Sequence, residues 1–164
     1  MIPLPDGLTV GYVTSGDLSA RLIELRSAGG PSHATTLAAP GWVIDARLKG
    51  GVQRRPVSYL EGAKVAWYRV LAPMGAVART ITALESQTGK PYDWRDIIDF
   101  AIPQRFQEPW RTPDAWICSE LQAWAEEQGE VLPKLVTAYN RLAPADIMLA
   151  NSARGMIPLA GPMF

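Results

Sequence analysis

The chain has 164 residues, 48% of them hydrophobic and 20% charged, a composition typical of a globular protein large enough to bury a core. Lysine and arginine together number 16, as do aspartate and glutamate, so the clustered positive charge of a nucleic-acid-binding protein is not expected. The single cysteine excludes an internal disulfide, and no apolar run approaches the ~20 residues of a membrane span. We therefore expect one domain over residues 1–164, with no nucleic-acid partner and no membrane span.

The N-terminal segment, Met1-Ile-Pro-Leu-Pro-Asp-Gly, lacks the basic region and long apolar core of a signal peptide. Taken as it stands, the sequence predicts a cytoplasmic protein. A trimmed chain or a non-standard export route would give the same pattern.

The first half of the chain has the pattern of short strands separated by glycine and proline turns. Leucines at helical spacing predict one helix there, over Asp17–Ser27, and Gly29-Gly30-Pro31 ends it. Pro40-Gly41 marks a turn between two of the strands. Strands are expected at Leu8–Val13 (as an edge strand), Ser32–Ala38, Trp42–Arg47, Val52–Arg55 and Lys64–Leu71.

Helices dominate the second half of the chain. Val77, Ile81 and Leu84 share one face of a predicted helix, and Gly89 follows where a C-terminal cap belongs. Helices are expected at Gly75–Thr88, Trp94–Ala101 and Cys118–Gln128, with one short turn at Ile147–Leu149 and no clear period over Asn151–Phe164. Together the patterns predict an α+β fold in which a small antiparallel sheet packs against helices.

The only cysteine, Cys118, lies near the start of a predicted amphipathic helix, shortly after the helix-start signal Thr112-Pro113-Asp114. The unpaired N–H groups and the positive dipole end of a helix N-terminus favour thiolate over thiol, and the thiolate is the reactive form. Cys118 is therefore a candidate nucleophile. The alternative interpretation is a small, buried hydrophobic residue, which is common for a free cysteine.

A thiolate nucleophile needs a base, and the only histidine is His33, at the start of a predicted strand. The base in turn needs an orienting group. Asp45 is the best candidate, because it interrupts an apolar run in the next strand, where a carboxylate is costly unless it has a partner. The alternatives are a structural His33 and an Asp45 that forms a salt bridge with Arg47 or Arg55.

The register of the two strands makes this prediction testable. A plain two-residue hairpin at Pro40-Gly41 would pair Ala39 with Trp42 and place His33 and Asp45 on opposite faces. A loop of odd length, or a bulge, makes His33 and Asp45 diagonal neighbours on one face, roughly 7–8 Å apart at the backbone. A catalytic Asp45 therefore predicts an odd-length loop or a bulge.

Several short motifs then carry a resemblance to a known family. The motifs are Gly30-Pro31-Ser32-His33-Ala34, Trp42-Val43-Ile44-Asp45-Ala46, Gly51-Val52, Tyr92-Asp93-Trp94, Trp116-Ile117-Cys118-Ser119-Glu120-Leu121 and Ala143-Pro144-Ala145-Asp146-Ile147. In their order and spacing they resemble the permuted NlpC/P60 cysteine peptidases, papain-like proteins in which the histidine strand precedes the cysteine helix. The similarity covers about residues 8–150 and leaves 151–164 as a tail. The sequence departs from the family at Ala34, where a valine is more usual.

The resemblance implies that Cys118 is the nucleophile, His33 the base and Asp45 the third polar member. It also implies hydrolysis of an amide in a peptide or lipopeptide, with cell-wall peptide first, and no cofactor. Other functions remain open: a lipid acyltransferase or thioesterase of related permuted fold, or a non-catalytic binding module or phage or secretion-associated structural protein. A metal enzyme is not expected, since one histidine and one cysteine are too few soft ligands for an ordinary zinc site.

Four further groups have a predicted role. The backbone N–H of Cys118 is the natural first oxyanion donor. Tyr92 and Trp116 are candidates to line a substrate cleft, although each fits the core equally well. Glu120 lies on another side of the predicted helix, where a solvent-facing or structural role is expected.

Overall fold

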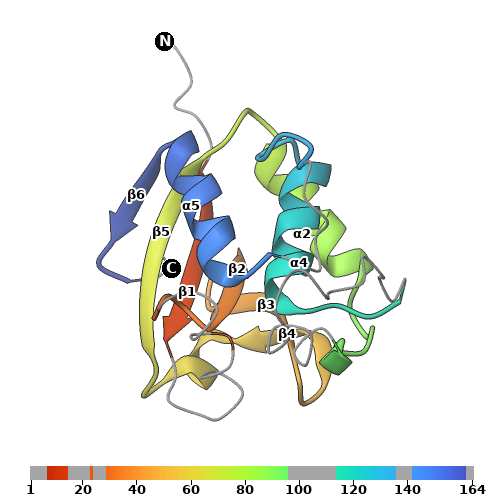
Figure 1. Ribbon diagram of the computed structural model, residues 1–164. Helices are drawn as coiled ribbons and strands as arrows, with labels where there is room; N and C mark the ends of the chain where they lie inside the picture. The colour runs from red at the N-terminus through yellow and green to blue at the C-terminus, as the bar shows by residue number, and fades with distance from the viewer. Residues whose placement is uncertain (1–6, 15–22, 24–28, 96–113, 136–141, 162–164) are drawn as a thin grey trace, which may run out of the picture.

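The structure is a computed structural model that describes residues 7–14, 23, 29–95, 114–135 and 142–161 (Figure 1). Within these ranges the chain is α+β, with one six-stranded antiparallel sheet and three α-helices. The predicted helices over Asp17–Ser27 and Trp94–Ala101 fall almost entirely on residues outside these ranges and stay predictions. No helix in the described part of the chain has both the length and the apolar character needed to span a membrane.

Among the described elements, five of the six strands precede the helices of the second half of the chain. The strands are β1 (Gly7–Thr14), β2 (His33–Ala39), β3 (Trp42–Arg47), β4 (Gly51–Pro56), β5 (Lys64–Leu71) and β6 (Met156–Leu159). The helices are α2 (Ala76–Ser86), α4 (Cys118–Gln128) and α5 (Pro144–Arg154), and the 3₁₀ turn η1 spans Val57–Leu60.

The sheet order is β4-β3-β2-β1-β5-β6, so β1 lies inside the sheet and the prediction of an edge strand is wrong. The strand pairs with β2 on one side and with β5 on the other. Its residues from Leu8 to Val13 are all buried, which requires cover on both faces of the strand. The glycines and prolines around it suggested an edge, but its backbone is paired on both sides.

The end of the chain is more regular than predicted. The short turn expected at Ile147–Leu149 is part of α5, an 11-residue helix with a proline in its first turn. The Asp146 carboxylate accepts a hydrogen bond from the backbone N–H of Ala143 at 2.7 Å, which caps the helix start. Part of the predicted tail, Met156–Leu159, forms the edge strand β6 beside β5.

The β2–β3 hairpin contains the predicted bulge. The paired residues are Ala39 with Trp42, Leu37 with Val43 and Thr36 with Ile44. The register therefore shifts between Leu37 and Ala39, and Ala38 is an extra residue on β2. Continued toward the start of β2, the shifted register places His33 and Asp45 on one face of the sheet as diagonal neighbours. The sequence analysis required an odd-length loop or a bulge for a His33–Asp45 pair. The structure has the bulge.

Helix α4 lies in the interior of the fold. It packs against α2, β2, β3 and α5, and Figure 1 shows its first turn at the end of the sheet where β2 begins. Because neighbours surround it, α4 is buried on most sides, and the predicted one-sided amphipathic pattern is wrong. Its buried residues are Cys118, Ser119, Glu120, Leu121, Gln122, Ala123, Ala125 and Glu126. Two roles were expected for Glu120, solvent-facing or structural, and its burial excludes the solvent-facing one.

A buried carboxyl lies in the polar part of this interior. Glu126 Oε1 accepts hydrogen bonds from Gln122 Nε2 at 2.6 Å and from Asn151 Nδ2 at 3.2 Å. Burial raises the pKa of Glu126 from 4.5 to about 7, and these two hydrogen bonds only partly oppose that rise. The folded state therefore holds a proton on Glu126 at pH values where the unfolded chain has lost it.

Glu126→Gln is expected to remove a pH dependence from the stability of the protein. The folded pKa of Glu126 is raised, so wild type loses about 3 kcal/mol of its free energy of unfolding as pH rises from 4.5 to about 7. The variant should show no such loss and should be more stable than wild type at pH 8, measured by urea unfolding across pH. Glu85→Gln, which changes a half-exposed carboxylate on α2, should keep the wild-type slope. Equal slopes for wild type and Glu126→Gln would contradict the expectation.

Candidate active site

Cys118 is the first residue of α4, so the helix begins at the cysteine itself. The residue before it, Ile117, is extended, and no side chain caps the helix N-terminus. The helix thus starts at Cys118, as predicted, and the upstream signal Thr112-Pro113-Asp114 does not start it. Asp114 lies in a turn and Trp116 forms a β-bridge with Tyr92, while Thr112 and Pro113 lie outside the described ranges. The thiol of Cys118 therefore lies beside the first-turn N–H groups and the positive end of the helix dipole.

Core contacts on both sides of Cys118 fix the start of α4. The side chain of Trp116, 1% exposed, donates from Nε1 to Gln87 Oε1 at 3.2 Å and packs on Trp124 at 5.1 Å between ring centroids. The hydroxyl of Ser119 donates to the carbonyl oxygen of Leu142 at 2.6 Å. Trp116 is thus a core residue that supports the site, rather than the exposed cleft wall that was one of its expected roles. Tyr92 is partly buried and packs on two core clusters.

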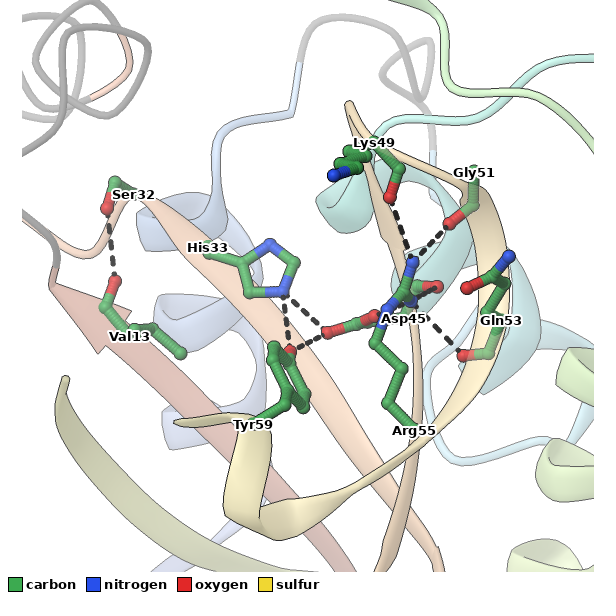
Figure 2. A network of polar contacts seen from close by, with 9 residues as sticks. All are labelled: Val13, Ser32, His33, Asp45, Lys49, Gly51, Gln53, Arg55 and Tyr59. Atoms are coloured by element: carbon green, nitrogen blue, oxygen red, sulfur yellow. Dashed lines mark hydrogen bonds and ion pairs between the residues drawn. The ribbon is translucent and has the colours of Figure 1, made fainter. Parts of the chain in front are cut away.

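His33 and Asp45 form the pair that the sequence predicted. His33 is the first residue of β2 and Asp45 lies within β3, and His33 Nε2 is 2.7 Å from Asp45 Oδ2 (Figure 2). The side chains are 13% and 0% exposed, respectively. Such a short contact in a buried place indicates that Nε2–H donates to a carboxylate. The ring is then oriented with Nε2 toward β3 and Nδ1 left for another partner.

Asp45 has two more hydrogen-bond partners, Arg55, which the sequence analysis considered, and Tyr59, which it did not. Arg55 Nη1 donates to Asp45 Oδ1 at 2.5 Å, and the Tyr59 hydroxyl donates to Oδ2 (Figure 2). The ion pair with Arg55, weighed as an alternative to a role beside His33, is therefore present together with it. The sequence did not identify Tyr59 as a site residue, because the segment that holds it has no periodic pattern.

The contacts set the charge states of the site. Burial alone would raise the pKa of the Asp45 carboxyl, but His33, a hydrogen bond from Tyr59 and the Arg55 guanidinium together hold it below its usual range. Burial alone would lower the pKa of His33, but electrostatic interactions with Cys118 and Asp45, and hydrogen bonds with both, raise it to about 9. At neutral pH the imidazole is therefore protonated between a carboxylate and the Cys118 sulfur.

The site thus brings together residues from the late helix and the early sheet. Cys118 comes from α4, His33 from β2 and Asp45 from β3, and the imidazole contacts the Asp45 carboxylate through Nε2 and interacts with Cys118. A nucleophile beside a base that a third group orients can form and hydrolyse a covalent acyl intermediate. Cys118 itself is 3% exposed, so little of the residue is open to solvent.

Comparison with protein-family models and with curated protein sequences gives no match for this chain.

Proposed function

We propose that this protein is a cysteine hydrolase that cleaves an amide bond in a peptide or lipopeptide, with Cys118 as nucleophile, His33 as base and Asp45 as its orienting group. The observation that carries the proposal is that the only histidine of the sequence, His33, hydrogen-bonds Asp45 and interacts with the only cysteine, Cys118. A thiol beside an imidazole that a carboxylate orients is the arrangement that thiol-dependent acyl transfer needs.

In the proposed mechanism, the resting site is a thiolate–imidazolium pair. The Cys118 sulfur attacks the amide carbonyl carbon, and the carbonyl π electrons move to the oxygen. As the oxyanion collapses, the C–N bond breaks and the proton on His33 Nδ1 goes to the leaving amine. Neutral His33 then takes a proton from water, the hydroxide attacks the thioester, and the C–S bond breaks to restore the pair.

The helix start supplies the first donor for the oxyanion. Because α4 begins at Cys118, the backbone N–H of this residue points out of the helix terminus toward the space beside its own sulfur. A donor fixed in this way is aimed where negative charge develops and costs no reorganisation during the reaction.

A permuted papain-like arrangement of the NlpC/P60 type is part of the proposal. It is supported by the order of the elements, since the strand with His33 and the strand with Asp45 both precede the helix that begins at Cys118. The motif resemblance in the sequence favours cell-wall peptide as the first substrate class to test.

The burial of Cys118 favours a second candidate, a non-catalytic member of this fold used for binding. At 3% exposed, Cys118 is buried to the extent of an ordinary core cysteine. The two candidates differ in one property: a hydrolase must admit small electrophiles to the sulfur of the folded protein, whereas a binding module need not.

Alkylation of the folded protein with iodoacetamide across pH tests the proposed function. Wild type is expected to react at pH 6, where an ordinary thiol with a pKa of ~8.5 is almost fully protonated. His33→Ala should react only as an ordinary thiol, because the imidazolium no longer stabilises the thiolate. Since the chain has one cysteine, each label is on Cys118, and Cys118→Ser gives the blank.

Two results count against the hydrolase. One is labelling that occurs only after unfolding in urea, which would favour the binding module. The other is an identical pH dependence of alkylation for wild type and His33→Ala, since His33 would then have no effect on the reactivity of Cys118.

A further inference from the structure

Tyr59 makes polar contacts with both His33 and Asp45 that the proposed mechanism does not explain. It lies in η1, the 3₁₀ turn that directly follows β4. Its hydroxyl donates to Asp45 Oδ2, the same oxygen that accepts from His33, and lies 3.4 Å from His33 Nε2 (Figure 2). The hydroxyl is thus at the junction between the base and its orienting carboxylate.

Two arginine side chains contact the ring of Tyr59. The guanidinium carbons of Arg47 and Arg55 lie 5.2 Å and 5.9 Å from the ring centroid, within the range of cation–π attraction. η1 packs with the cluster on this side of the sheet, which includes Val43, two residues before Asp45 on the same face of β3. The hydroxyl therefore comes from a ring that has little freedom to swing away.

Arg55 completes the clamp on the other carboxylate oxygen. Nη1 donates to Asp45 Oδ1 at 2.5 Å and to the Asp45 carbonyl oxygen at 3.2 Å, and Nη2 donates to the Gly51 carbonyl oxygen at 3.1 Å. The guanidinium is thereby tied to the β3–β4 hairpin. Besides the hydrogen bond with His33, each carboxylate oxygen of Asp45 therefore accepts a hydrogen bond from a donor of its own, Arg55 on Oδ1 and Tyr59 on Oδ2.

Such a clamp matters because the terminal torsion of an aspartate is soft. A carboxylate that rotates takes Oδ2 away from Nε2, and the imidazole then loses the contact that keeps Nδ1 toward Cys118. Catalytic groups must stay within roughly 10–20° of the productive geometry to be effective.

We propose that Tyr59 is a positioning residue for the hydrolysis proposed above: its hydroxyl, with Arg55 on the opposite oxygen, keeps Asp45 aimed at His33. The inference rests on the proposed function, since it assigns a task within that site. Tyr59 touches neither the nucleophile nor the scissile bond, and acts through Asp45 and His33.

Tyr59→Phe tests the inference, because it removes the hydroxyl and keeps the ring that contacts the two guanidinium groups. The rate of Cys118 alkylation by iodoacetamide at pH 6 should fall roughly tenfold, the size expected from one hydrogen bond to a charged group. The NMR signal of the proton on His33 Nε2 should move and exchange faster with water. This signal needs no assignment, since the chain has one histidine.

A matched control is Tyr68→Phe, which removes a hydroxyl on β5, where the ring packs on Tyr12 at 6.0 Å between centroids. It should change neither readout. Should Tyr59→Phe fail to fold, Arg55→Lys, which keeps the charge and loses the second donor, should change the His33 signal in the same direction.

The outcomes separate this inference from the proposed function. If wild-type Cys118 depends on His33 but Tyr59→Phe behaves as wild type in both readouts, the positioning role is wrong and the hydrolase stands. If Tyr59→Phe only lowers the melting temperature, with an unchanged His33 signal in the folded protein, Tyr59 is purely structural. If wild type shows no dependence on His33, the proposed function fails first.

Discussion

Cys118→Ser is expected to lower the rate of amide hydrolysis by roughly 10⁴-fold or more, because a serine hydroxyl at this place is neither ionised nor as nucleophilic as the thiolate it replaces. The fold should persist, since the change is a single buried atom at the first turn of α4. The measurement is the release of amines from cell-wall peptides by the purified protein, followed by mass spectrometry of the fragments. Fragment masses also report which bond breaks.

Ser119→Ala is the matched control for this experiment. It lies next to Cys118, and it removes a buried hydrogen bond of 2.6 Å from the Ser119 hydroxyl to the Leu142 carbonyl oxygen. It should cost about 1 kcal/mol of stability and leave hydrolysis within a few-fold of wild type. A wild-type rate in Cys118→Ser would remove the nucleophile from the proposal and, with it, the hydrolase.

The nature of the site explains how far the sequence could predict it. Cysteine and histidine each occur once, so no choice among candidates was needed. Asp45 was found because a carboxylate inside an apolar strand requires a partner. Its reach to His33 depended on register, and the observed shift at Ala38 is of the kind that the pairing required.

What the sequence missed depends on contacts between segments far apart in the chain. The burial of α4 on most sides comes from α2, α5 and the sheet together, and a helical period within one segment does not show it. β1 was placed at an edge because pairing on both sides is invisible in a single strand. Tyr59 reaches Asp45 only because η1 folds back over β3, and nothing in the local pattern near residue 59 signals this.

Asp45 is a residue whose loss should disturb both the stability of the fold and its function. Its side chain is 0% exposed and lies between the His33 imidazole and an Arg55 side chain that is 12% exposed. Asp45→Ala leaves that guanidinium buried without its counter-charge. The expected cost is about 3–5 kcal/mol in the free energy of unfolding, as for other buried pairs that lose one partner.

Asp45→Asn separates the electrostatic role from the packing role, because the amide has nearly the same shape. Hydrolysis should fall roughly 10²- to 10⁴-fold, since an amide neither stabilises an imidazolium nor fixes one ring orientation. The pKa of His33, followed by NMR of its ring protons, should fall from about 9, because the Asp45 charge and hydrogen bond that raise it are gone. A His33 pKa that stays near 9 would contradict the assignment of Asp45.

The same pKa values fix how the stability of wild type and Asp45→Asn should differ with pH. The folded pKa of His33 is raised, so its contribution is fully present below about 6.5 and is lost as pH rises through about 9. The folded pKa of Asp45 is lowered, so its contribution is present above about 3.8 and is lost as pH falls through the folded value. Wild type should therefore exceed Asp45→Asn most between about pH 4 and 6.5, where both contributions act. Urea unfolding of the two proteins across pH 3–10 measures this difference, and an equal gap at every pH would mean that Asp45 stabilises the fold by shape rather than by charge.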